Sequence, residues 1–289
     1  MYNLFLIIVA IIPAVVLCVY VYKKDRIEKE PLTLLLKLLL LGALCCYPAA
    51  IIENILFDVI SKLLFWNITL NYLFTRSAYI IIHNFFVVAL VEEGCKYFVL
   101  NKVTRKNREF NSLFDGIIYA VFVSLGFAAF ENVFYVIENG ITVGIMRAVL
   151  SVPGHMFFAV MMGYFYSRSH IKDKASMLEI SLIKRGIISY NKPLFNSKKE
   201  RLLTLVIPII LHGTYNSCCS IGTTFSTLLL VTLVIFMYVY CFGKILKVSK
   251  NDTYENSYIM YMMTSKYPEL SVNDQQVKQT NDIEENIKI

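Results

Sequence analysis

Two glutamates and a lysine stand inside an apolar run, residues 78–100, that is otherwise typical of a membrane span. The run is long enough to cross a hydrocarbon core of about 30 Å at about 1.5 Å per residue. In a helix Glu92 and Lys96 share one face and can pair, whereas Glu93 lies about 100° further round. Because ionisable groups in a bilayer are costly and normally face the bundle interior or a water-filled cavity, this set indicates a functional site. The alternative, a structural ion pair between Glu92 and Lys96, leaves Glu93 unexplained.

Three other apolar runs carry polar residues well inside their bounds: Glu131 with Asn132, His155, and His212 with Asn216. Along the expected spans they lie at a depth similar to that of the glutamate pair, so side chains from four helices can converge. Each has a simpler explanation when taken alone, because polar side chains also join helices by hydrogen bonds in membrane bundles. Together, three glutamates, two histidines and an asparagine in four apolar helices favour a site.

Two hydrolytic chemistries suit this set. In the first, a desolvated carboxylate acts as general base on a water, while histidine and asparagine donate hydrogen bonds to the oxyanion of a carbonyl under attack. In the second, glutamate and histidine ligands hold a divalent metal such as zinc, which acidifies the water. The ligands would then come from Glu92, Glu131, His155 and His212 on separate helices. No compact motif such as HExxH is present, so both chemistries stay open and the cofactor is either absent or a divalent metal.

Composition predicts a membrane protein. The chain has 289 residues, of which 57% are hydrophobic and 17% charged, with a mean hydropathy of +0.58. This is too apolar for a soluble domain of average composition. Apolar runs of about 20 residues predict an all-α polytopic transmembrane helical bundle with about seven spans. The runs are residues 4–22, 32–52, 78–100, 113–137, 145–166, 202–219 and 223–242.

The basic residues predict the orientation of the spans. They gather in the connections after the first, third, fifth and seventh runs, whereas the alternate connections carry few. By the positive-inside rule the N-terminus lies outside and the C-terminus in the cytoplasm. This distribution accounts for the net charge of +7 and argues against a nucleic-acid partner; the expected surroundings are the lipid bilayer.

The end of the chain differs in composition from the membrane domain. From residue 249 onward it is rich in polar residues with little apolar pattern, which predicts a transmembrane domain at residues 1–248 and a flexible cytoplasmic tail at residues 249–289. The seven cysteines lie within or at the ends of apolar runs and form no CxxC. They are typical of packing residues and do not favour a metal–thiolate site.

The polar motifs resemble those of the PrsW family of intramembrane proteases, which is more distantly related to the CAAX prenyl endopeptidases and the bacteriocin-immunity (CPBP) membrane proteins. The similarity extends over nearly the whole membrane region. The matching elements are Glu92 to Lys96 as an EExxK element, Asp115-Gly116, Phe127 to Asn132, Arg147 to His155, Gly163-Tyr164-Phe165, and His212 to Asn216 as an HxxxN element.

The wider family's pattern implies roles for these residues. Glu92 would activate water, and His212 with Asn216 would polarise the carbonyl. Glu93 and Lys96 would orient the base or support the fold.

The chain departs from the CAAX-type pattern in two places. The CAAX-type pattern has an arginine one residue after the position of Lys96, whereas this chain has the basic residue at Lys96 itself. Glu131 takes the last position of an FxxxH element, where the pattern has a histidine. Either Glu131 or His155 therefore supplies the function of that second motif. Asn132 and Arg147 are expected to support the site.

The resemblance also implies a substrate and a location. It implies a peptidase in the cytoplasmic membrane of a bacterium that cleaves a single-span membrane protein, of the anti-sigma factor type, as the first step of regulated intramembrane proteolysis. One alternative is a non-catalytic CPBP-like binding or immunity protein whose buried polar residues are structural. Another is an ion or proton conductor, which the absence of an internal repeat disfavours.

Overall fold

The computed structural model describes residues 2–65, 72–188 and 194–271. Within these ranges the chain is helical, and the only strand-type pairing is an isolated antiparallel bridge between Ser112 and Tyr254. The longer elements are α1 (Tyr2–Lys24), α2 (Leu32–Leu44), α3 (Cys46–Phe65), α4 (Tyr72–Ile82), η1 (His83–Ala89), α5 (Leu90–Thr104), α6 (Asp115–Asn139), α7 (Ile141–Val149), α8 (Ser151–Lys184), α9 (Lys198–Ile221), α10 (Thr224–Lys250) and α11 (Glu255–Lys266). A short 3₁₀ turn, η2 (Pro268–Ser271), follows α11.

Seven helical stretches in the described residues are long and apolar enough to cross a membrane, which confirms the predicted all-α bundle of about seven spans. Four of them extend well beyond the expected runs: residues 32–62, 76–104, 141–184 and 224–250, of which the first three are composite. The three composite stretches each join more than one helix, because the backbone bends or changes its helical type within the span. The orientation of the termini stays a prediction.

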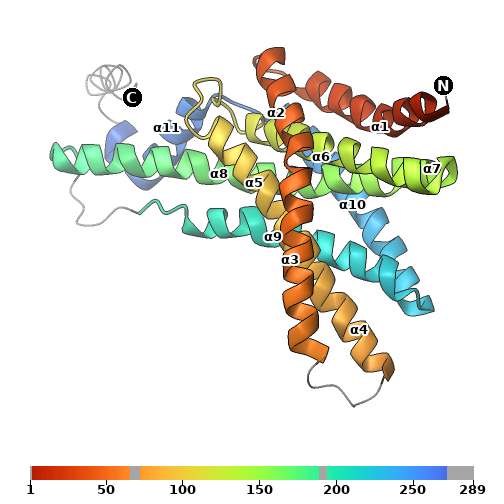
Figure 1. Cartoon of the computed structure of the whole chain (residues 1–289). Helices are drawn as coiled ribbons and strands as arrows, with labels where there is room; N and C mark the ends of the chain where they lie inside the picture. The colour runs from red at the N-terminus through yellow and green to blue at the C-terminus, as the bar shows by residue number, and fades with distance from the viewer. Residues whose placement is uncertain (1, 66–71, 189–193, 272–289) are drawn as a thin grey trace.

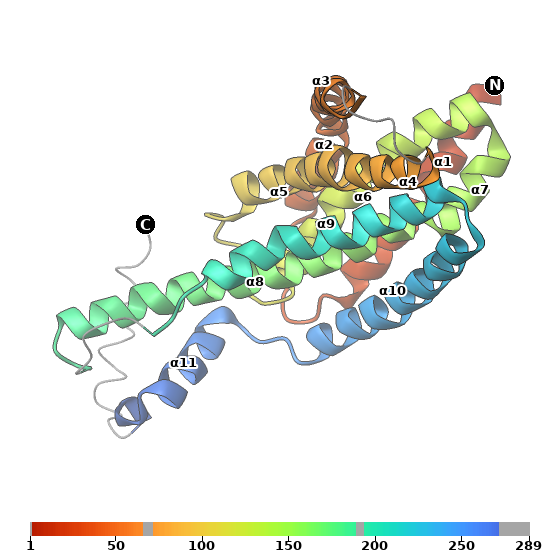
Figure 2. The ribbon, with the colours of Figure 1, turned by 90° about the horizontal axis from the view of Figure 1, so that it is seen from below.

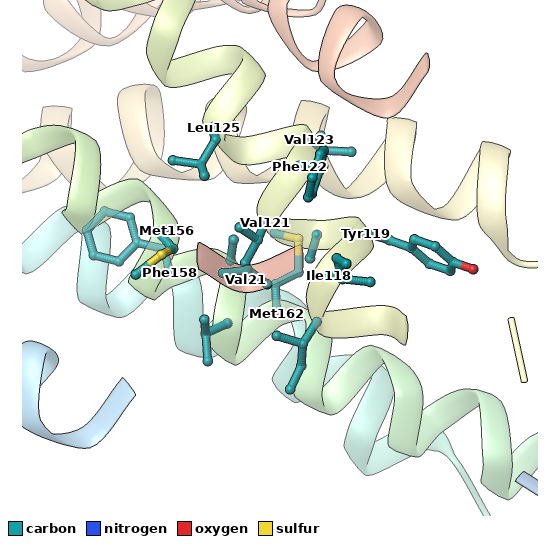
Figure 3. Close-up of a cluster of buried hydrophobic side chains, with 14 of the residues drawn as sticks. Val21, Ile118, Tyr119, Val121, Phe122, Val123, Leu125, Met156, Phe158 and Met162 are labelled. Atoms are coloured by element: carbon teal, nitrogen blue, oxygen red, sulfur yellow. The ribbon is translucent and has the colours of Figure 1, made fainter. Parts of the chain in front are cut away.

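The centre of the bundle is α6, which is the most deeply buried span and packs against α1, α2 and α8. Figure 3 shows side chains of α1, α6 and α8 meeting in this core. Glycines bring α2 and α6 into backbone contact: a Cβ on Gly42 would lie 2.0 Å from the carbonyl oxygen of Val123. A Cβ on Gly126 would lie 2.0 Å from the carbonyl oxygen of Leu39. Small residues that allow such close approach are typical of helix packing in membranes.

The second and third spans run differently from the rest. In Figures 1 and 2, α2 and α3 run across the direction of α8 and α9. The third span contains a π-helical segment, η1, between α4 and α5. A π segment adds a residue to a turn and is frequent at functional sites. Here it ends at Ala89, directly before the turn that carries the glutamate pair.

The α8–α11 end of the molecule carries more structure than the sequence predicts. α8 continues to Lys184, well past the expected end of its span, and α11 packs against it through a second apolar cluster that includes Ile171 and Met263. Lys174 forms an ion pair with Glu255 at the start of α11. Residues 249–271 are largely helical and packed, whereas residues 272–289 of the expected flexible tail lie outside the described residues.

Candidate active site

The glutamate pair lies in the first turn of α5 and is shielded from solvent. Glu92 is 6% exposed, Glu93 is fully buried, and Lys96 one turn later is 1% exposed. The Lys96 ammonium donates to Oε2 of Glu92 over 3.0 Å and to Oε1 of Glu93 over 2.8 Å. The pairing of Glu92 with Lys96 expected from their spacing is therefore present, and Lys96 binds Glu93 as well.

Lys96 also links the pair to α8. Its Nζ lies 3.2 Å from Nδ1 of His155 and 4.2 Å from the centre of the Phe127 ring. An ammonium has three protons and no acceptor, so two carboxylates and one imidazole nitrogen satisfy it. His155 Nδ1 must then be the acceptor, which places the proton of the neutral imidazole on Nε2.

That proton faces Glu131 of α6. His155 Nε2 lies 3.0 Å from Oε2 of Glu131, and Arg147 Nη2 of α7 lies 3.0 Å from the same oxygen. The Arg147 Nε–H donates to Oδ1 of Asn132, whose amide donates to the carbonyl of Ala10 in α1. The structure therefore brings Glu131 and His155 together as one hydrogen-bonded pair, with Arg147 and Asn132 behind it.

His212 of α9 contacts the glutamate pair through Glu93. Its Nδ1 lies 3.0 Å from Oε1 of Glu93, and its Nε2 lies 3.1 Å from Nδ2 of Asn216 one turn later. Because the Asn216 amide nitrogen carries only protons, His212 Nε2 accepts, and Nδ1–H donates to Glu93. The His212 ring lies 5.4 Å from that of His155 and stacks on Phe158 at 4.9 Å.

A cavity of about 660 Å³ opens beside these residues. Glu92, Glu131, His155, His212 and Asn216 line it, whereas Glu93 and Lys96 are absent from its wall and lie behind Glu92 and His212. The Oε1 atom of Glu92 accepts no hydrogen bond from the residues that the structure describes, so a water in the cavity can reach it. The six residues expected to be catalytic thus form one connected group, of which five face the cavity.

The same group has donors that suit a metal. Glu92, Glu93 and His155 each offer a ligand atom within 4.8 Å of the others. Two carboxylates and an imidazole are a donor set that zinc accepts, and Oε2 of Glu93 is buried without a hydrogen-bond partner. The sequence predicted ligands from Glu92, Glu131, His155 and His212, whereas the group in the structure contains Glu93 in place of Glu131 and His212. By donor chemistry the residues fit a divalent ion, which when bound would acidify a water, and the Lys96 ammonium is the positive charge that already lies among them.

Sequence reasoning missed two kinds of cavity residue. Phe127, which belongs to a matching element but had no predicted role, and Phe158, which the sequence does not distinguish from other apolar residues, both contact the charged centre. Glu53 of α3 also lines the cavity, although the second span was expected to end before it, at residue 52. The signal that could have identified Glu53 is a carboxylate among apolar residues in the middle of residues 46–65.

Comparisons with known proteins agree with the motifs. A family model described as PrsW family intramembrane metalloprotease matches residues 30–242. The chain is similar to a protein named Protease PrsW from Clostridioides difficile, with 33% identity over 241 residues that cover 82% of this chain and 88% of the relative. A Protease PrsW from Oceanobacillus iheyensis is 32% identical over 242 residues, covering 83% and 94%. One from Bacillus subtilis is 28% identical over 234 residues, covering 81% and 89%. No solved structure matches the chain.

Proposed function

The chain belongs to the PrsW family of intramembrane proteases, and we propose that Glu92 activates the water with which it hydrolyses a peptide bond. Family membership and seven apolar helices confirm the predicted multi-pass membrane peptidase, and they agree with the predicted location in a bacterial cytoplasmic membrane. They also disfavour the alternative of a non-catalytic binding protein. The observation that carries the proposed mechanism is the position of Glu92, in the cavity wall with one oxygen held by Lys96 and the other free.

In this mechanism the proton of the attacking water passes to Glu92 as the water oxygen bonds to the carbonyl carbon. A base that has a fixed second oxygen needs little reorganisation at that moment, which is why the Lys96 contact matters. The proton is then delivered to the amide nitrogen, which leaves as an amine. His155, held between Lys96 and Glu131, forms the adjoining wall of the cavity and fixes the position of the Lys96 ammonium that holds Glu92.

The oxyanion of the tetrahedral intermediate is assigned to Asn216. One proton of its amide points to Nε2 of His212, and the other is available to a carbonyl oxygen in the cavity. His212 is itself fixed by Glu93, and Glu93 by Lys96. Glu93, Lys96 and His212 therefore act by positioning the donor, because preorganised donors lower the barrier without moving during the reaction.

The proposed substrate is a membrane-anchored regulatory protein, of the anti-sigma factor type that the family resemblance implies. Its scissile segment must be locally unwound, because every backbone amide of an intact membrane helix is already hydrogen-bonded. A cavity of about 660 Å³ inside the bundle suits a short extended segment better than a whole helix. Identification of the membrane protein that accumulates uncut when the gene is deleted tests this substrate class.

The substitution Glu92→Gln tests the role of the base. It keeps the size of the side chain but removes its basicity, so we expect cleavage to fall by about 10²–10⁴-fold while the protein level stays unchanged. Glu138→Gln, at an exposed position of α6, is the matched control and should cleave normally. Normal cleavage by Glu92→Gln would remove Glu92 from the mechanism.

The metal is tested separately by elemental analysis of the purified protein before and after chelation, paired with the cleavage rate. Full activity in metal-free protein would assign the chemistry to the side chains alone. Loss of activity that zinc restores would show that the reaction needs the ion, for which Glu92, Glu93 and His155 are the candidate ligands.

A further inference from the structure

Glu53 is a cavity-lining carboxylate that has no partner among the described residues. It lies in α3, on the face that also presents Cys46 and Ala50 to the cavity, as their spacing of about two helical turns requires. Among the residues that the structure describes, it forms no hydrogen bond and no salt bridge. None of the catalytic or positioning roles proposed above includes Glu53.

The other charges around the cavity are already paired. Glu92 is bound by Lys96, and Glu131 is bound by Arg147 and His155. Arg147, the one basic side chain of the described cavity wall that carries a permanent charge, also donates to Asn132. No cation of this wall is left to neutralise Glu53, so the cavity presents an excess of negative charge to whatever enters it.

A carboxylate in a membrane span is costly unless it is paired or hydrated. At Glu53 a cationic group that enters the cavity can supply the partner that the described residues do not. Helix α7 contributes Thr142, Val143 and Met146 to the same cavity, and its one charged lining residue, Arg147, is already bound to Glu131. A segment in this cavity would thus meet Glu53 as an acidic side chain that no cation of the described wall neutralises.

We propose that Glu53 is a specificity-determining residue that binds a lysine or arginine side chain of the substrate segment near the scissile bond. The inference rests on the proposed function, since the occupant is taken to be the substrate. It is separate from the chemical step, because Glu53 contacts none of Glu92, His212 or Asn216 through a hydrogen bond. Charge complementarity in a partly desolvated site favours the matching residue and penalises one of like charge.

The test uses a panel of single-span test proteins with a leucine–alanine helix. One position at a time, through the last turn of the helix and the flanking segment at each end, carries lysine, glutamine or glutamate. Each test protein is co-expressed with the full-length wild-type protease, with Glu53→Gln or with Glu53→Lys. Asp58→Lys is the matched control, because Asp58 is an exposed acid on the same helix outside the cavity wall.

Two readouts are measured. Cleavage reports the reaction, and co-purification with a Glu92→Gln protease reports binding when cleavage is blocked. At one or two panel positions we expect wild type to favour lysine over glutamate by about tenfold or more. Glu53→Gln should remove the preference, Glu53→Lys should reverse it, and Asp58→Lys should keep it.

The two readouts separate the inference from the proposed function. Charge-dependent capture without cleavage of any test protein would support the role of Glu53 while contradicting the proposed reaction. Cleavage or capture that is indifferent to the lysine, glutamine and glutamate series in the wild type, or the same ranking in Glu53→Lys as in the wild type, would overturn the inference. If Glu53→Lys does not accumulate, the isosteric Glu53→Gln variant decides, because retained lysine preference there contradicts a charge contact.

Discussion

The protein buries two groups of carboxylates, and they are built in opposite ways. The intramembrane cluster consists of Glu92, Glu93, Lys96, Glu131, Arg147, His155 and His212. Each of its three carboxylates contacts a lysine or arginine within 3.0 Å, and the cluster borders a cavity. The helix-end cluster consists of Asp25, Glu30, Ser112, Asp115, Tyr119 and Asp252. Its four carboxyl groups form no salt bridge within the described part of the chain.

Hydroxyls and backbone amides replace cations in the helix-end cluster. Tyr119 donates to Glu30 over 2.6 Å, and the amides of Asn111 and Ser112 donate to Asp115 over 2.8 and 2.6 Å. Ser112 Oγ also lies 2.9 Å from Asp252, in the connection between α10 and α11. These contacts tie the start of α6 to the α1–α2 and α10–α11 connections.

The difference teaches what each arrangement is suited to. Ionised carboxylates held by cations next to a cavity are ready to accept a proton from a water. Carboxyls packed against one another without cations are instead held partly protonated by burial. Burial raises the pKa of Glu30 to about 9, with Asp115 nearby adding to the effect, and raises the pKa of Asp25 and of Asp252 to about 6. The first cluster is suited to chemistry and the second to joining segments.

Removal of the Lys96 ammonium from the intramembrane cluster should have the largest effect on stability and activity. Lys96→Met leaves Glu92 and Glu93 buried without their ammonium, so we expect a loss of about 3–5 kcal/mol in the free energy of unfolding and loss of cleavage. Thermal unfolding in detergent measures the first effect. Lys37→Met, at an exposed position of α2, is the control and should leave stability within about 0.5 kcal/mol. Wild-type stability in Lys96→Met would mean that the glutamates do not depend on the cation.

Asn216→Ala tests whether the intramembrane cluster stabilises an oxyanion. Loss of one such donor lowers the rate by about 10²–10³-fold, and the protein should accumulate normally because Asn216 is only partly buried. Ser220→Ala is the matched control, one turn later on α9 and also in the cavity wall. Initial rates of cleavage of one test protein by both variants give the comparison, and equal rates would reassign the donor.

The helix-end cluster should make stability depend on pH. A carboxyl whose pKa is raised by folding keeps its proton in the native state after the unfolded chain has lost it, so stability falls as pH rises. For Asp25 and Asp252 the fall runs from about pH 4 to about 6, and for Glu30 it extends to about 9.

The expected size of this effect is on the order of a few kcal/mol between pH 6 and 9, at up to about 1.4 kcal/mol per pH unit, and Glu30→Gln should flatten that part of the profile. Melting temperatures at a series of pH values measure it. Glu28→Gln, the exposed neighbour, should keep the wild-type slope. A wild-type melting temperature that rises with pH over this range would show that these carboxyls are ionised in the native state.

Several features of this site were predictable because they follow from local rules. Helical spacing places Glu92 beside Lys96, and costly polar residues in apolar spans indicate that His155 and His212 turn inward. Contacts between helices do not follow from such rules. That Glu93 would meet His212, and that Lys96 would reach His155, depends on how closely the helices approach one another.

Two further features of the structure could not be predicted from the sequence. Glu53 enters the cavity because α3 begins anew after Cys45, so that a residue counted as lying beyond the second span faces inward. α11 has little apolar periodicity of its own, and its packing against α8 rests on a few residues such as Ile259 and Met263. The division at residue 248 stays a prediction, and α10 itself continues to Lys250.

The wide turns of η1 have a consequence for the genetics of the third span. A π-helical turn holds an additional residue, so it takes up that residue while α4 and α5 keep one continuous helical path. Deleting one residue within His83–Ala89 would let the span relax to a uniform α-helix and leave Glu92 and Glu93 near their present direction relative to α4. A frame-preserving single-codon loss there would therefore be tolerated better than the same loss in a uniform α-helical turn, where each deleted residue rotates one half by about 100°.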